Sequence, residues 1–110
     1  MRLRFPPFPL ARFRVDQRSM SPALDPGDYV LVNRWAYAFR EPEVGDLVVF
    51  HDPERPRVYL CKRIAQSAGP GSYIVLGDNE AVSRDSRWFG PIPRALIVGK
   101  VWRAARGSRR

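Results

Sequence analysis

The chain has 110 residues, of which 45% are apolar, and this length suits one domain with a modest core. Its longest uninterrupted apolar run, 35–39, is far shorter than the ~20 residues of a membrane helix, and prolines at 6, 7 and 9 interrupt any secretory h-region. We therefore expect a cytoplasmic protein without a membrane-spanning segment. The single cysteine, Cys61, excludes an internal disulfide.

The net charge of +8 is concentrated at the two ends. Between Ser19 and Lys100 ten basic residues balance ten acidic ones, which argues against a specific nucleic-acid partner. We divide the chain into a basic, Pro- and Phe-rich arm (1–14), a folded domain (15–102) and a basic tail (103–110). Solvated ends are the simpler interpretation; the alternative is peripheral contact with an anionic membrane surface, aided by the phenylalanines at 5, 8 and 13.

Short β-type runs, each bounded by Gly, Pro, Asp or Asn, follow one another along the chain. They lie at 13–15, 29–33, 47–50, 58–64, 73–76 and 96–102. No segment has a sustained 3.6-residue apolar period, and eleven prolines leave little room for helix beyond a turn or two at 35–40. The sequence predicts a compact, loop-rich, mainly β fold.

The run 58–64 carries a lysine on its apolar side. Side chains alternate along a strand, so Val58, Leu60, Lys62 and Ile64 share one face. In water a lysine has a pKa near 10.4, and only about one in 2,500 is neutral at pH 7. Burial would lower this pKa, at a cost of roughly 3 to 4 kcal/mol for a shift of ~2 to 3 units. A neutral lysine can take the proton of a serine hydroxyl.

The residues alone do not decide which serine meets Lys62. Ser19 and Ser21 precede Pro22 in a predicted tight bend, and a second polar loop contains Ser83 and Ser86. The alternative interpretation is that Lys62 reaches solvent and that these serines only cap turns.

Four sequence boxes resemble those of bacterial signal peptidase I and its relatives. Residues 19–28 match S-M-x-P-x-L-x-x-G-D, 45–50 match the next box, 59–63 match the segment ending in K-R, and 77–90 match G-D-N-x-x-x-S-x-D-S-R-x-x-G. The boxes occur in the family's order and are spread from 19 to 90, within 15–102. The resemblance implies a mostly antiparallel β fold and a serine endopeptidase that needs no cofactor and no metal.

The resemblance also implies roles for individual residues. Ser19 matches the nucleophile, whose backbone N–H contributes to the oxyanion hole, and Lys62 matches the general base. Ser83 matches the hydroxyl that orients this lysine, and Asp85 and Arg87 match the pair that supports the last box.

Further positions concern the substrate and the oxyanion. Met20 and Pro22 match the segment beside pockets for small residues. Gln17 stands where many signal peptidases have a serine, so we expect its amide to be the second oxyanion donor. Only eighteen residues precede the first box, too few for the family's usual membrane anchors, and this points to a minimal member.

Among such members, the chain is similar to the nickel-type superoxide dismutase maturation proteases. This similarity implies removal of an N-terminal pro-segment from a dismutase precursor, with the nickel belonging to the substrate. One alternative is a general leader peptidase held peripherally at the membrane. A self-cleaving repressor is disfavoured, because the chain has no DNA-binding domain and no Ala-Gly site before Ser19.

Three other interpretations are disfavoured. A non-catalytic β module would bind peptides, or nucleic acid through the tryptophans at 35, 88 and 102, which more often pack a core or its rim. A thiol pair of His51 and Cys61 lacks a recognisable context. The acidic and amide groups at 78–80 and 85 lack the spacing of a calcium loop.

Overall fold

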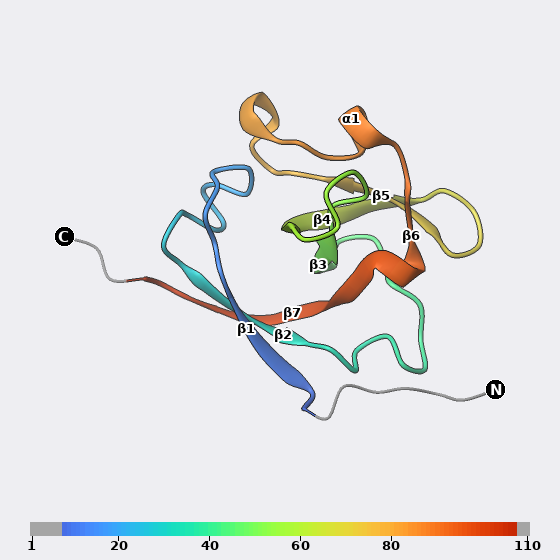
Figure 1. Cartoon of the computed structure of the whole chain (residues 1–110), viewed down its shortest axis with the longest axis horizontal. Helices are drawn as coiled ribbons and strands as arrows, with labels where there is room; N and C mark the ends of the chain where they lie inside the picture. Colours follow the sequence, from blue (N-terminus) through green and yellow to red (C-terminus); the bar gives the residue numbers. More distant parts are fainter. Residues whose placement is uncertain (1–7, 108–110) are drawn as a thin grey trace.

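The computed structural model describes residues 8–107, which form one curled antiparallel sheet with three short helical turns (Figure 1). The strands are β1 (Leu10–Arg14), β2 (Tyr29–Asn33), β3 (Leu47–His51), β4 (Tyr59–Ser67), β5 (Ser72–Leu76), β6 (Ile92–Pro93) and β7 (Ile97–Ala105). The turns are η1 (Glu80–Val82), α1 (Ser86–Phe89) and η2 (Arg94–Leu96). The expected mainly β, compact fold with little helix is confirmed.

The strands follow the order β1-β2-β7-β3-β4-β5-β6. Strand β7 joins the two halves of the sheet, because its second half pairs with β2 and its first half pairs with β3. Both pairings contain a register shift, and such bulges increase the local bend of a sheet. In Figure 1, β1 and β2 lie below β3, β4 and β5, so the sheet curls around its own interior.

Strands extend past the bounds 15–102 at both ends. Strand β1 begins at Leu10, inside the predicted arm, and pairs with β2 along its whole length. Strand β7 continues to Ala105, inside the predicted tail. The remaining arm residues 1–7, which include Phe5, and residues 108–110 lie outside the described part of the chain. Within 8–107, no helix is long and apolar enough to cross a membrane.

Buried side chains form two clusters on opposite faces of the sheet. Strand β3 contributes to both, with Val48 and Phe50 in one cluster and Val49 in the other. Strand β4 buries Leu60, Lys62 and Ile64 and leaves the residues between them partly exposed. The predicted alternation is confirmed for these three residues, and it sends a lysine toward the interior. Val58, predicted on the same face, precedes β4 and is exposed.

Candidate active site

Ser19 lies in the loop between β1 and β2, where backbone hydrogen bonds fix its position. Its carbonyl accepts the N–H of Asn79 at 2.7 Å, and the Asn79 side-chain amide donates to the Arg18 carbonyl at 3.1 Å. On the other side of Ser19, the buried side chains of Met20 and Leu24 pack into the core. The loop is therefore held by the core below it and by the segment 77–90 beside it.

Lys62 reaches the same point from β4. Its side chain is only 1% exposed, and Nζ donates a hydrogen bond to Ser19 Oγ. Burial lowers the pKa of Lys62 below its ordinary value, and the nearby Asp85 carboxylate opposes part of this effect. The structure thus brings the predicted serine and lysine together, in surroundings that favour the neutral amine.

Asp85 is the fully buried centre of the segment 77–90. It accepts hydrogen bonds from the Gly77 N–H at 2.8 Å, the Ser83 hydroxyl at 2.5 Å, and Arg87 Nε and Nη2 at 3.0 and 2.5 Å. Burial alone would raise the pKa of Asp85, but the bonds from Arg87, Gly77 and Ser83 hold it well below its usual range. A charged, fully bonded carboxylate therefore lies close to Lys62.

The Ser83 hydroxyl donates its hydrogen bond to Asp85, and the Lys62 amine donates to Ser19. Within the described part of the chain, no hydrogen bond joins the side chains of Ser83 and Lys62 directly. A Cβ atom built on Gly77 would overlap the Ser83 side chain and the Ser19 carbonyl oxygen. Gly77 therefore permits a close approach of the segment 77–90 to the Ser19 loop. The lysine-orienting role of Ser83 stays a prediction.

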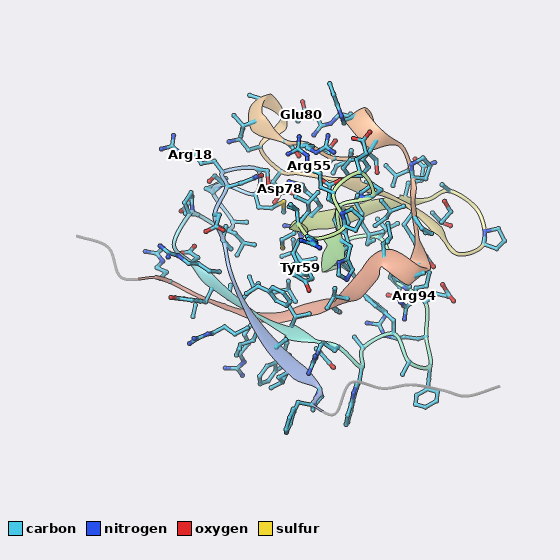
Figure 2. All side chains as sticks on the ribbon, in the orientation of Figure 1. Arg18, Arg55, Tyr59, Asp78, Glu80 and Arg94 are labelled. Atoms are coloured by element: carbon cyan, nitrogen blue, oxygen red, sulfur yellow. The ribbon has the colours of Figure 1, made fainter. Side chains whose placement is uncertain are left out.

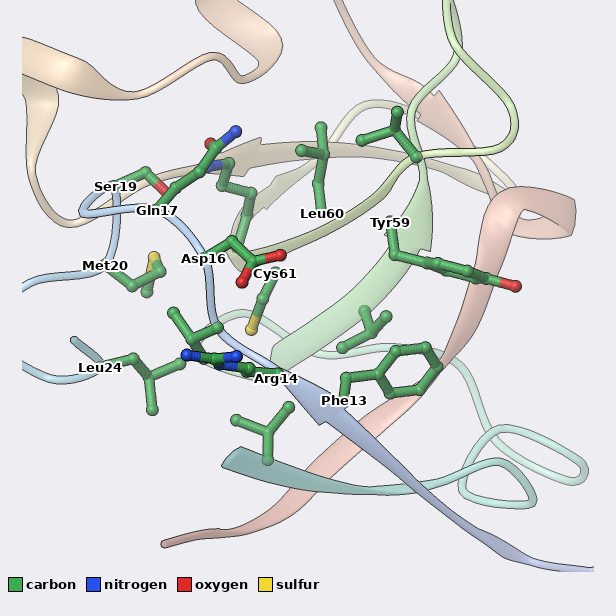
Figure 3. Close-up of a pocket in the computed structure, with 15 residues that line it drawn as sticks. Phe13, Arg14, Asp16, Gln17, Ser19, Met20, Leu24, Tyr59, Leu60 and Cys61 are labelled. Atoms are coloured by element: carbon green, nitrogen blue, oxygen red, sulfur yellow. The ribbon is translucent and has the colours of Figure 1, made fainter. Parts of the chain in front are cut away.

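A pocket of about 140 Å³ opens beside Ser19 and Lys62 (Figure 3). Its lining is mainly apolar and includes Phe13, Val15, Met20, Leu24, Val30, Val49 and Cys61. Gln17 lines it on the Ser19 side, whereas Tyr59 and Phe13 lie at the other end. Met20 thus contributes to the pocket, but Pro22 is exposed and is not part of the lining.

The structure does not assemble the thiol pair or the cation site that the sequence analysis disfavours. Burial raises the pKa of Cys61 to about 12, and His51 lies opposite Tyr59 in the strand register, not opposite Cys61. Asp78 pairs with Arg63 at 2.9 Å. Across residues 8–107, no three His, Cys, Asp or Glu side chains gather as a metal site would require.

Fold and site together define a class: small β-sheet proteins in which a buried lysine contacts a serine at the end of an apolar pocket. A family model described as "Signal peptidase, peptidase S26" matches residues 5–70 and 65–104. The chain belongs to this family.

Relatives come from two organelles. "Mitochondrial ATP-independent inner membrane protease subunit 1b" of Arabidopsis thaliana is 35% identical over 77% of this chain and 64% of its own length. "Mitochondrial inner membrane protease subunit 1" of Schizosaccharomyces pombe is 35% identical over 76% and 65%. "Thylakoidal processing peptidase 1, chloroplastic" of Arabidopsis thaliana is 31% identical over 78% and 39%. The chain spans just under two thirds of the first two proteins, and none of the three names mentions a dismutase.

Proposed function

We propose that this protein is a serine endopeptidase that removes an N-terminal segment from a precursor protein. The observation that carries the proposal is the hydrogen bond between the buried Lys62 amine and Ser19 Oγ. A serine hydroxyl is a weak nucleophile until a base accepts its proton, and an amine kept neutral by burial is such a base.

In the proposed reaction, Ser19 Oγ attacks the carbonyl carbon of the scissile bond while its proton passes to Lys62 Nζ. Lys62 then gives that proton to the leaving nitrogen, the C–N bond breaks, and an acyl group remains on Ser19. A water molecule then gives a proton to Lys62 and attacks this ester. The bond between the acyl carbon and Ser19 Oγ breaks, Lys62 returns the proton to Ser19 Oγ, and the acyl group leaves as a carboxylic acid that ionises in water. The Ser19 backbone N–H and the Gln17 side-chain amide stabilise the oxyanion.

The segment 77–90 supports this pair. Asp85 keeps a negative charge near Lys62 and accepts hydrogen bonds from both Ser83 and Arg87. In the proposed mechanism, this charge stabilises the protonated amine that forms during attack. Ser83, which donates to the same carboxylate, acts in this proposal as the hydroxyl that orients Lys62.

The pocket holds the part of the substrate that precedes the scissile bond. It runs between the chain after β1 and the start of β4, with apolar walls, and its volume of about 140 Å³ suits small side chains next to Ser19. Small residues before the scissile bond are also what the sequence resemblance implies. The relatives' names, which are those of proteases and of a processing peptidase, support a precursor substrate.

The substrate that we propose first is a nickel-type superoxide dismutase precursor. Mass spectrometry of this precursor and of a secretory signal-peptide fusion, each incubated with wild type, Ser19→Ala and the control Ser21→Ala, tests the proposal. Cleavage of the dismutase precursor alone, lost only in Ser19→Ala, supports a maturation protease. Cleavage of the signal-peptide fusion assigns a general leader peptidase instead, and equal cleavage by wild type and Ser19→Ala would contradict a Ser19 nucleophile.

One face of the sheet favours that second candidate, a leader peptidase held at the membrane surface. The strands β1, β2 and β7 contain no Asp or Glu. On them, the Arg12 guanidinium lies over Tyr29 at 4.9 Å and the Arg103 guanidinium over Trp102 at 4.7 Å. Arginines beside aromatic rings suit an anionic lipid interface.

Vesicles of phosphatidylcholine with phosphatidylglycerol test this candidate. Arg12→Ser combined with Arg103→Ser should weaken binding about 10- to 30-fold. The control, Arg55→Ser with Arg57→Ser, removes the same charge from an exposed loop elsewhere. Equal binding by both double variants would exclude this face as the contact, and a preference for an oligonucleotide over the vesicles would exclude the membrane.

A further inference from the structure

Arg84 stands between two residues of the site but points away from them. Ser83 and Asp85 both have extended backbone angles, with φ of −91° and −147°. In extended chain, neighbouring side chains alternate between opposite sides. Ser83 and Asp85 therefore face the interior together, and Arg84 extends to the opposite side of the segment.

On that side Arg84 meets Asp52, which directly follows β3 and is only 1% exposed. Arg84 Nε and Nη2 donate to the two oxygens of Asp52 at 3.0 and 3.1 Å. This forked arrangement fixes direction as well as distance. Nη2 also reaches Glu54 Oε1 at 2.7 Å, so the guanidinium connects the segment 77–90 with the loop between β3 and β4.

The loop 52–58 is itself firmly held. One Asp52 side-chain oxygen accepts the N–H groups of Glu54 and Arg55 at 2.8 and 3.2 Å, and the Asp52 N–H donates to the Val58 carbonyl at 2.9 Å. Figure 2 shows Arg55 of this loop and Glu80 of the segment 77–90 on the same side of the molecule. Because β4 leaves this loop and carries Lys62, the contact ties the lysine-bearing hairpin to the segment that holds Ser83 and Asp85.

We propose that Arg84 and Asp52 are a positioning pair that holds the Ser83–Asp85 segment in register with the hairpin carrying Lys62. The inference rests on the proposed peptidase function and adds to it a pair that touches neither Ser19 nor the pocket. Losing the contact would let the segment move away from Lys62, and misplacement by about 1 Å can slow a reaction about 100-fold.

The test compares Arg84→Gln, Asp52→Asn and the double variant on a precursor that wild type cleaves. Active sites are counted with a serine-reactive phosphonate, so that kcat refers to folded enzyme. We expect kcat to fall about 10- to 100-fold with KM changed less than about twofold, because the pocket is untouched. The double variant should be no worse than either single variant, because each removes the same contact.

Two further variants separate positioning from stability. Arg84→Lys keeps the positive charge but cannot make the two parallel hydrogen bonds to Asp52, so most of the fall in kcat should remain. Arg84→Ala should regain activity when guanidinium is added at low concentration. Arg55→Gln, an exposed change in the same loop, is the control and should match wild type. Unchanged kcat per active site in Arg84→Gln and Asp52→Asn, with only fewer sites, would overturn the inference.

A readout without substrate keeps this test distinct from that of the proposed function. Lys62 Nζ can be titrated by NMR. In Arg84→Gln its midpoint should rise toward that of an ordinary lysine, because burial is the larger influence on this pKa and the water admitted by a loosened segment outweighs the loss of the nearby Asp85 charge. If wild type cleaves nothing, the peptidase proposal fails, while this titration still reports on the pair. An unchanged midpoint in Arg84→Gln would overturn the positioning role.

Discussion

Strand β4 carries two neighbouring basic residues, one buried and one partly exposed to solvent. Lys62 is 1% exposed and its amine contacts a neutral serine hydroxyl. Arg63, on the other face, has a side chain 37% exposed and bonds the Asp78 carboxylate through Nε and Nη2 at 3.1 and 2.9 Å. Burial lowers the pKa of Lys62, whereas the hydrogen bond to Asp78 raises that of Arg63.

The difference shows that the face of the strand and the residue type together decide what a basic side chain does. An arginine paired with a carboxylate in partial contact with water keeps its charge and contributes little net stability. A lysine buried beside a hydroxyl can lose its proton at moderate pH, and only then can it act as a base.

The largest expected effect is on hydrolysis. Lys62→Met and Ser19→Ala should each reduce kcat/KM more than about 1,000-fold, because neither protein can transfer the proton from the serine to an amine. Arg63→Gln, the neighbouring change on the other face, should stay within a few-fold of wild type. The measurement is cleavage of a precursor at fixed enzyme concentration. Similar losses in Arg63→Gln and Lys62→Met would break the distinction between the two faces.

The pH profile sharpens the same contrast. Since Lys62 must be neutral to accept a proton, kcat/KM should rise about tenfold per pH unit and level off above the pKa of Lys62. Burial places this plateau below pH 10.4, the pKa of an ordinary lysine. A rise that continues to about pH 10 would show that the amine is solvated.

The next effect concerns the stability of the segment beside Lys62. Asp85→Asn leaves Arg87, Ser83 and Gly77 without a carboxylate and should lower the free energy of unfolding by about 3 kcal/mol. The folded pKa of Asp85 is depressed, so its contribution is present above an unfolded pKa of about 3.9 and disappears as pH falls through the folded value. Urea unfolding at neutral and acid pH should show the two proteins converging at acid pH; a constant difference would contradict the assignment.

The face and burial of Lys62 could be predicted from the sequence because they depend on a period of two along one strand. The partner of Lys62 could not, since Ser19 and Ser83 are both far from it in sequence and only the family resemblance chose between them. The bond from Ser83 to Asp85 and the fork from Arg84 to Asp52 depend on how separate loops pack, which leaves no local signal. Strand β6 is not among the predicted strands because its two residues carry no periodicity.

A change in stability of comparable size and opposite sign is expected from Lys62→Met. Methionine fills a similar volume without a charge, so the free energy of unfolding at neutral pH should increase by about 1 to 4 kcal/mol while activity is lost. With its folded pKa below the unfolded one, Lys62 binds more protons in the unfolded state, so wild-type stability rises with pH between the two values. Denaturation from neutral to alkaline pH should show this rise in wild type and not in Lys62→Met. A less stable variant would mean that the Lys62 amine stabilises the fold.

The smallest effect belongs to the exposed cation. Arg63→Gln and Asp78→Asn should each change the free energy of unfolding by less than about 1 kcal/mol, because both side chains of this pair remain partly in water. The double variant should differ little from either single variant, and added salt should reduce the differences further. Urea unfolding of the four proteins at low and high salt measures this directly. A coupling above about 2 kcal/mol that resists salt would mean that Arg63 and Asp78 hold the edge of the site. The residues on the two faces of β4 would then differ in their proton chemistry but contribute similarly to stability.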